Sequence, residues 1–265
     1  MDKRKIIYYS DEQNDEFSKA VIEPIHIGGS YRYDRTKGFS AVIRFFFYRI
    51  IATPLAYIYC KMSLHYKCVN RKILRPYKKT GYFLYGNHTS NYGDPLMPNL
   101  FAFPKNVYFI VHPNNVSMKF LGTINKYIGA IPLPDDVTAA KNFTTFVNAR
   151  IENKDVVTIY PEAHIWPYYT KIRNFPDKSF GYPARTCTPV FCFTNTYQKR
   201  FLFGKELKKP KIRTYIDGPF LPDTEKPLGE RKRELRNLVY EAMTERAKLS
   251  DKEFIIYKRK EEAVD

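Results

Sequence analysis

Short β-forming runs alternate with helical stretches along most of the chain, and this alternation limits the folds open to it. The runs are rich in β-branched and aromatic residues, which favour strands, and several segments between them have helical spacing. Strands that alternate with helices predict an α/β domain with a mostly parallel sheet flanked by helices. In such sheets, chemistry lies in loops beyond the carboxyl ends of the strands. We expect strands at 64–69, 82–85, 107–111, 156–160, 189–194 and 212–216, and helices at 95–101, 117–127, 136–152 and 230–249.

The segment 38–62 is the most apolar part of the chain. A membrane span needs roughly 20 apolar residues, and here Arg49 and Pro54 interrupt a shorter run, which Pro54 is expected to kink or divide. The pattern favours a membrane-associating helical segment that lies in the plane of the membrane or re-enters it. A buried core helix and a true span remain alternatives.

Composition and organisation point to one main domain. The 265 residues are 44% hydrophobic, which is enough to build a sizeable core and excludes a disordered chain. We divide the sequence into an N-terminal arm (1–37), the membrane-associating segment (38–62), the main domain (63–250) and a charged C-terminal tail (251–265).

The chain is strongly basic. It has 44 Lys and Arg against 27 Asp and Glu, a net charge of +17, which attracts nucleic acid, anionic membranes or phosphorylated substrates. Aromatic residues make up 16% and would suit a nucleic-acid stacking groove. However, the basic residues are spread along the chain without a nucleic-acid motif, and such a role leaves the apolar segment unexplained. We therefore expect an anionic membrane surface as partner and no nucleic acid.

The cysteines and the N-terminus indicate a reducing compartment. The four cysteines lack the spacing of a zinc site, so we expect free thiols and no metal. Acidic residues from Asp11 to Glu16 occupy the place of the apolar core of a secretory signal, so none is expected.

His88 and Asp94 form the candidate catalytic pair. His88 follows the buried run at 82–85 through a loop of small and polar residues, and Asp94 stands before Pro95, where it is expected to cap a helix. A carboxylate that holds one ring nitrogen of His88 leaves the other free to take a proton from a hydroxyl. No GxSxG nucleophile elbow occurs, so the pattern predicts direct transfer without a covalent intermediate. The same residues also fit an ordinary loop histidine and a plain helix cap.

Four blocks give the chain a resemblance to a known family. They are NHTSNYGDP at 87–95, KFLG with GAIP within 119–132, YPE at 160–162 and TPVF at 188–191. The first resembles the NHxxxxD motif of glycerolipid acyltransferases, the lysophosphatidic acid acyltransferase group, and the others follow in that family's order. The apolar segment 38–62 is similar to the two-helix membrane motif that precedes the family's histidine. The resemblance extends over roughly 38–220 and together these blocks are specific.

The resemblance implies an O-acyltransferase of phospholipid biosynthesis. Such an enzyme moves an acyl chain from acyl-CoA or acyl carrier protein to a hydroxyl of a lysophospholipid such as 1-acyl-glycerol-3-phosphate. It implies His88 as general base, Asp94 as the residue that orients it, no cofactor, and a peripheral or monotopic position on the cytoplasmic face of the membrane. At the acceptor site the resemblance implies Glu162, with Asn87 of the first block. His164 is a further candidate that also fits an ordinary histidine at a strand end, and Lys171 and Arg173 are candidates because of their basic side chains.

The sequence departs from the family pattern at three places. Five residues, rather than four, separate His88 from Asp94, and Gly93 is the expected insertion. The second block ends in LPDD at 133–136 instead of a phosphate-binding Arg, and Ala163-His164 replaces Gly-Thr. Lys171 and Arg173 are alternative phosphate ligands or part of a solvated basic face. A hydrolase and an inactive lipid-binding relative are the rival functions.

Overall fold

The computed structural model describes residues 4–17 and 22–260. Their centre is a seven-stranded sheet with strand order β2-β10-β7-β3-β6-β4-β5. In this sheet β7 and β10 are antiparallel, and the other neighbouring pairs are parallel. The expected α/β fold with a mostly parallel sheet is confirmed. The strands are β2 (Lys67–Val69), β3 (Tyr82–Gly86), β4 (Val107–Val111), β5 (Ala130–Pro132), β6 (Val156–Ile159), β7 (Val190–Gln198) and β10 (Lys211–Phe220).

Helices connect the strands, as parallel pairing requires. Asp136 caps the helix expected at 136–152 and accepts a hydrogen bond from the amide of Ala139 at 2.7 Å. The helix expected at 117–127 is wrong in its bounds, because extended backbone at Met118 separates two short helices. The helices are α1 (Gly38–Phe45), η1 (Phe46–Ala52), α2 (Thr53–Met62), η2 (Arg71–Lys79), α3 (Met97–Phe101), α4 (Asn114–Ser117), α5 (Lys119–Tyr127), α6 (Val137–Glu152), η3 (Lys178–Phe180), α7 (Gly181–Thr186) and α8 (Leu228–Ala247).

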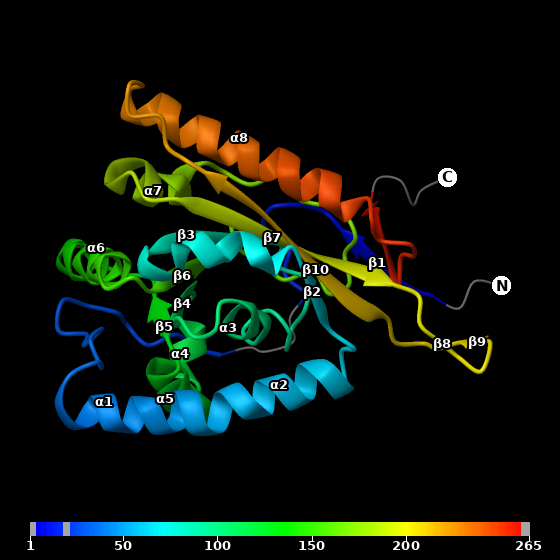
Figure 1. The fold of residues 1–265 in the computed structure, drawn as a ribbon, viewed down its shortest axis with the longest axis horizontal. Coiled ribbons are helices and arrows are strands. Elements are labelled where there is room, and N and C mark those ends of the chain that lie inside the picture. The colour runs from blue at the N-terminus through cyan, green and yellow to red at the C-terminus, as the bar shows by residue number, and fades with distance from the viewer. Residues whose placement is uncertain (1–3, 18–21, 261–265) are drawn as a thin grey trace.

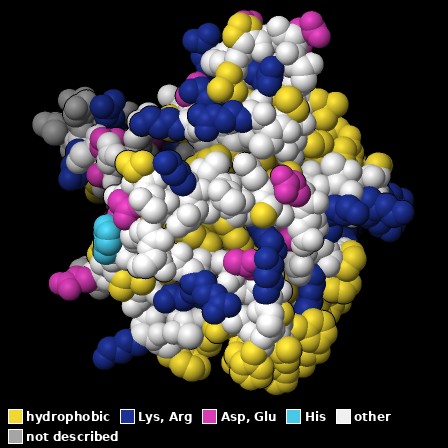
Figure 2. Space-filling view, turned by 90° about the vertical axis from the view of Figure 1, so that its left-hand side faces the viewer, with side chains coloured by type: hydrophobic (Ala, Val, Ile, Leu, Met, Phe, Trp, Pro, Cys, Tyr) yellow, Lys and Arg dark blue, Asp and Glu magenta, His cyan; other side chains and the backbone are white. Residues whose placement is uncertain are grey.

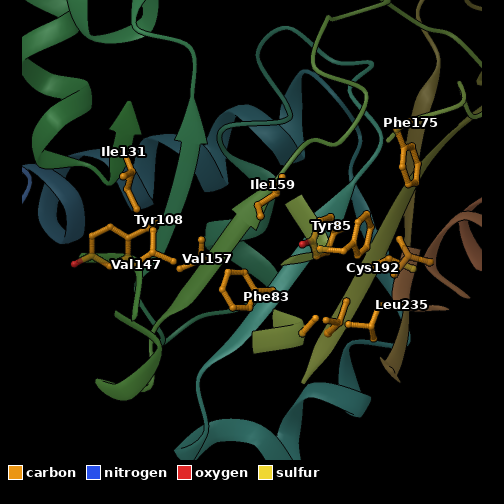
Figure 3. Close-up of a cluster of buried hydrophobic side chains, with 14 of the residues drawn as sticks. Phe83, Tyr85, Tyr108, Ile131, Val147, Val157, Ile159, Phe175, Cys192 and Leu235 are labelled. Atoms are coloured by element: carbon orange, nitrogen blue, oxygen red, sulfur yellow. The ribbon is translucent and has the colours of Figure 1, made fainter. Parts of the chain in front are cut away.

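Both faces of the sheet are covered (Figure 1). Phe83 and Tyr85 of β3 point into a core closed by α6, α7 and α8, and Figure 3 shows them beside Val157 and Leu235. Tyr82 and Leu84 point to the opposite face, into a core with α2, α3 and η2. Successive strand residues alternate between faces, so a strand buried on both sides is apolar throughout.

The segment from Gly38 to Met62 is one continuous 25-residue helix. Of the two effects expected of Pro54, a kink or a division into two helices, the division is therefore wrong. The wider π-helical turns of η1 come directly before Pro54, which lies in the first turn of α2. A proline ring crowds the carbonyl four residues earlier, and the wider turns accommodate that crowding without a break.

The same helix lies along the domain with one face outward. Arg44 donates to the carbonyl of Tyr127 at 2.7 Å, and Arg49 to that of Pro104 at 2.6 Å. On the outer face Phe39 is 78% exposed and Met62 is 70% exposed. The alternative of a purely buried core helix is wrong, because only the inner face packs on the domain.

The two ends of the described chain meet in a small sheet that the sequence did not predict. Strand β1 (Lys5–Tyr9) pairs in parallel with β11 (Ile255–Arg259). A separate hairpin consists of β8 (Phe201–Leu202) and β9 (Lys205–Glu206). The first and last residues of the expected arm and tail, 1–3 and 261–265, and residues 18–21 of the arm lie outside the described chain.

Candidate active site

The site begins where β3 ends. Gly86 is the last residue of β3, and a Cβ atom there would lie 2.1 Å from the ring of Phe193 on β7. Glycine is therefore required for the two strands to approach. Asn87 follows and exchanges two hydrogen bonds with the backbone of Asn195, at 2.8 and 3.1 Å. These contacts anchor the loop that carries His88 to the centre of the sheet.

His88 and Asp94 form a hydrogen-bonded pair. Nδ1 of His88 lies 2.8 Å from Oδ2 of Asp94. The Asp94 side chain is fully buried, whereas that of His88 is 24% exposed. Because the carboxylate accepts the proton of Nδ1, Nε2 of His88 is the ring nitrogen left free to accept a proton. The pair has the geometry of a general base and the carboxylate that orients it.

Asp94 does not cap a helix, contrary to expectation. Its Oδ2 accepts the amides of Thr89 and Ser90, each at 2.9 Å, and α3 begins only at Met97. The extra residue in the motif is accommodated by a turn, in which the Gly93 amide donates to the Ser90 hydroxyl at 3.1 Å. The carboxylate therefore closes the loop around His88 instead of capping the following helix.

A buried chain of amide and hydroxyl groups holds the other oxygen of Asp94. Asn195 donates to Oδ1 at 3.1 Å, and Thr214 on β10 donates to the Asn195 side chain at 2.6 Å. Burial raises the pKa of the Asp94 carboxyl, and the hydrogen bonds from His88, Ser90 and Thr89 oppose this rise. Asn195 and Thr214 are not among the site residues expected from sequence, although a polar residue within an apolar central strand is a recognisable signal.

Tyr160 forms one wall of the site. It follows β6, which lies beside β3, and its ring stacks on that of His88 with centroids 4.5 Å apart and an interplanar angle of 20°. Its hydroxyl donates to the backbone carbonyl of Asp94 at 2.6 Å. In the sequence, Tyr160 belongs to the motif block at 160–162 and has no role assigned to it. The structure places it against both members of the pair.

Glu162 and Arg173 form a buried ion pair next to the loop that carries His88. Glu162 accepts the backbone amide of His88 at 3.0 Å and that of Arg173 at 3.0 Å, and the two side chains pair at 3.3 Å. Both side chains are at most 1% exposed. A phosphate-binding Arg must reach its ligand, so this burial disagrees with the role suggested for Arg173. It also places Glu162 behind the backbone of His88 rather than in an open acceptor site.

The segment after Glu162 runs beside the loop that carries His88. Trp166 donates its amide to the carbonyl of His88 at 3.0 Å, and Tyr168 donates to that of Thr89 at 2.9 Å. The Trp166 indole stacks on Tyr257 of β11 with ring centroids 5.0 Å apart. The small terminal sheet thus supports the candidate site through Trp166.

The remaining expected site residues lie further out. His164 is partly exposed, and its Nδ1 lies 3.3 Å from a carboxylate oxygen of Glu16. Lys171 is exposed. Within the described residues no group of three or more His, Cys, Asp or Glu side chains is placed to hold a metal ion.

Comparison with known families assigns this region. The model of the family described as Acyltransferase matches residues 66–191, a range that contains His88, Asp94 and Glu162. These residues form an acyltransferase-family domain. The resemblance drawn from the four sequence blocks is thereby confirmed.

The chain also has a fold similar to that of a solved structure. The 1-acyl-sn-glycerophosphate (LPA) acyltransferase PlsC from Thermotoga maritima superposes with a TM-score of 0.52 and 14% sequence identity. The match covers 76% of this chain and 81% of that chain. At this identity the likeness concerns the fold. No curated protein matches the chain by sequence.

Proposed function

We propose that the protein transfers a fatty acyl chain from an acyl thioester, acyl-CoA or acyl carrier protein, to a hydroxyl of a lysophospholipid. The observation that carries this proposal is the 2.8 Å hydrogen bond between His88 and a buried Asp94, within an acyltransferase-family domain. The solved relative named an LPA acyltransferase supports a glycerolipid acceptor such as 1-acyl-glycerol-3-phosphate.

The proposed reaction uses His88 as general base. Nε2 removes the proton of the acceptor hydroxyl, whose oxygen attacks the thioester carbonyl carbon. The carbon–sulfur bond then breaks, and the departing thiolate takes the proton back from the imidazolium. Asp94 stabilises the imidazolium and holds the ring in the productive tautomer. Stacking with Tyr160 restricts the ring plane of His88.

The proposed acceptor site differs from the family pattern at 133–136, where the family has a phosphate-binding Arg and this chain has LPDD. Asp135 accepts the amide of Ile27 at 2.7 Å, and Asp136 accepts that of Gly29 at 3.1 Å. Carboxylates at this position would repel a phosphate. Their hydrogen bonds instead attach the segment around Ile27 and Gly29 to the domain. With Arg173 buried as well, the acceptors to compare include neutral and zwitterionic lysolipids beside lysophosphatidic acid.

The proposed membrane attachment is in-plane. The middle of the 25-residue helix is hydrogen-bonded to the domain through Arg44, Tyr48 and Arg49. If the helix crossed the membrane, these contacts would place part of the domain inside the bilayer. Figure 2 shows hydrophobic side chains gathered along the lower edge of the molecule, where α1 lies in Figure 1. This geometry supports a monotopic protein, whose catalytic side faces the cytoplasm because thioester donors are cytosolic.

The test is an acyl-transfer assay with purified protein in anionic liposomes. Radiolabelled acyl-CoA is the first donor, and the acceptors are lysophosphatidic acid, lysophosphatidylcholine and monoacylglycerol. The same acceptors are then tested with radiolabelled acyl-acyl carrier protein as the donor. His88→Ala should lower the rate on the order of 10²–10⁴-fold, the range for loss of a general base. His65→Asn serves as a matched control, because His65 has a positive φ of 45° that Asn tolerates.

The products distinguish the rival functions. A phospholipid product that disappears in His88→Ala and persists in His65→Asn supports the transferase. Free fatty acid formed at the same rate without acceptor indicates a hydrolase. A folded, vesicle-bound protein that turns over neither donor contradicts the proposal in favour of lipid binding alone.

A further inference from the structure

A basic pocket lies at the other end of β3 from His88. Its volume is about 250 Å³, and it is lined by η2, the first residue of β3 and the segment 101–105. Tyr82 begins β3 and His88 follows its end, so extended chain separates them by roughly 20 Å. The pocket is therefore separate from the candidate active site. Its cationic lining residues are Arg71, Lys72, Arg75, Lys78 and Lys105.

Three of these cations come from η2. Side chains three residues apart lie above one another in a 3-10 helix, and Lys72 and Arg75 have this spacing. Lys78 follows after a kink at Tyr77, and all three side chains are exposed and line the pocket. Leu74, on another side of η2, is buried in the core and fixes the orientation of the helix.

No carboxylate among the described residues forms an ion pair with any of the five cations. Asp155, whose charge acts on Lys105, is buried and lies 3.7 Å from the guanidinium of Arg150. Lys105 donates to the carbonyls of Lys78 and Thr80 at 3.2 and 2.9 Å, which fixes its ammonium at the pocket. The pocket therefore presents uncompensated positive charge.

Tyr82 adds a hydroxyl to the same pocket. Its side chain is fully buried and lines the pocket, and its hydroxyl has no hydrogen-bond partner among the described residues. A buried hydroxyl without a partner is uncommon in folded proteins and calls for a ligand or another explanation. A hydroxyl donor together with several Lys and Arg side chains suits an anion with many acceptor oxygens, above all a phosphate.

The pocket adjoins the apolar helix. Arg49 of η1 donates to the carbonyl of Pro104, and its guanidinium lies 5.5 Å from the ring centroid of Phe103. Both Phe103 and Pro104 line the pocket, and Phe103 is 51% exposed. On the helix itself Phe46 and Ile50 are 51% and 54% exposed. Cationic side chains thus lie next to an exposed apolar surface. This arrangement is complementary to a phospholipid, in which a charged headgroup adjoins apolar acyl chains.

We propose that this pocket binds the phosphate of an anionic phospholipid headgroup and holds the protein on the membrane at a site separate from His88. The inference does not rest on the proposed acyl transfer, because it concerns binding without turnover. Soluble phosphate has the same chemistry, so the experiment must separate the two sources.

Vesicle partitioning of the full chain tests the proposal. Phosphatidylcholine vesicles with and without phosphatidylglycerol are used, because phosphatidylglycerol is not the product of the proposed reaction. The triple variant Lys72→Gln, Arg75→Gln, Lys78→Gln should bind anionic vesicles roughly tenfold or more weakly. The control is Lys205→Gln, Lys208→Gln, Lys209→Gln, which removes the same charge from exposed positions in and beside the β8–β9 hairpin and should change binding less than about threefold.

Tyr82→Phe tests the pocket itself, because it removes only the hydroxyl and keeps the net charge. It should weaken binding to anionic vesicles several-fold and leave binding to neutral vesicles unchanged. Equal losses in the two triple variants, or no effect of Tyr82→Phe, would overturn the pocket in favour of diffuse electrostatic attraction. If inorganic phosphate, titrated by calorimetry, binds wild type but not Tyr82→Phe while vesicle partitioning is unaffected, the ligand is soluble and the lipid assignment fails.

Discussion

The carboxylate of Glu162 accepts the backbone amide of His88 at 3.0 Å, although the two residues are 74 positions apart. Glu162 thereby links the loop that carries the candidate base to a buried ion pair with Arg173. A carboxylate in this position orders the backbone of the site.

Removing this carboxylate should destabilise the protein. In Glu162→Ala the guanidinium of Arg173 stays buried without its partner, which typically costs about 3–5 kcal/mol. Urea denaturation measures the change. Glu162→Ala combined with Arg173→Met should recover part of the stability. At urea concentrations below the unfolding transition, Glu162→Ala should lower kcat and change KM less. The double variant should not restore kcat, because the amide of His88 still lacks its acceptor.

Asp94→Asn should show how much the negative charge of Asp94, as distinct from the size of its side chain, contributes to kcat. The variant keeps the size of the buried side chain but loses the carboxylate that stabilises the imidazolium, so kcat should fall on the order of 10²–10⁴-fold. A double variant with His88→Ala should lose little more, since the two residues act as a unit. A multiplicative loss would contradict the proposed pair.

The pH profile of the wild type should reflect the burial of Asp94. Burial raises the pKa of this carboxyl, so it takes up a proton at a higher pH than an exposed aspartate does. A protonated Asp94 no longer accepts from Nδ1 of His88. The rate should therefore fall as the pH is lowered, and the profile of kcat/KM against pH measures this fall.

Gly86→Ala should test the close packing of β3 against β7. The added Cβ would lie 2.1 Å from the Phe193 ring, so the ring must move. Overpacking of this kind costs about 1–3 kcal/mol. Thermal unfolding measures the loss, and a second change, Phe193→Leu, should lessen the penalty of Gly86→Ala relative to its effect in the wild type. Equal penalties in both backgrounds would rule out this contact as the cause.

Exposed residues of the apolar helix should control membrane binding without affecting the fold. Phe45 and Leu55 are 61% and 60% exposed, so Phe45→Glu with Leu55→Glu should change stability within about 0.5 kcal/mol. Vesicle partitioning should weaken strongly. The matched control is Phe203→Glu with Leu221→Glu, at exposed positions outside this helix. If both pairs reduce partitioning equally, the helix is not the membrane-binding element.

The local properties of the sequence determined the α/β class and the candidate pair. Strand and helix periods depend on near neighbours, so the elements around the sheet could be predicted from residue spacing. His88 and Asp94 are six residues apart on one loop, so their contact needed no knowledge of the rest of the chain.

Only the tertiary structure decided what surrounds that pair. Asn195 and Glu162 reach the loop from β7 and from the segment after β6, because parallel strands bring their carboxyl ends to one edge of the sheet. Asp94 accepts hydrogen bonds within the His88 loop instead of capping a helix, because a buried carboxylate must be hydrogen-bonded and these donors lie nearest to it. Arg173, expected from sequence as an alternative phosphate ligand or part of a solvated basic face, lies buried against Glu162. Which charges pair inside and which face water depends on long-range packing, and local sequence does not encode it.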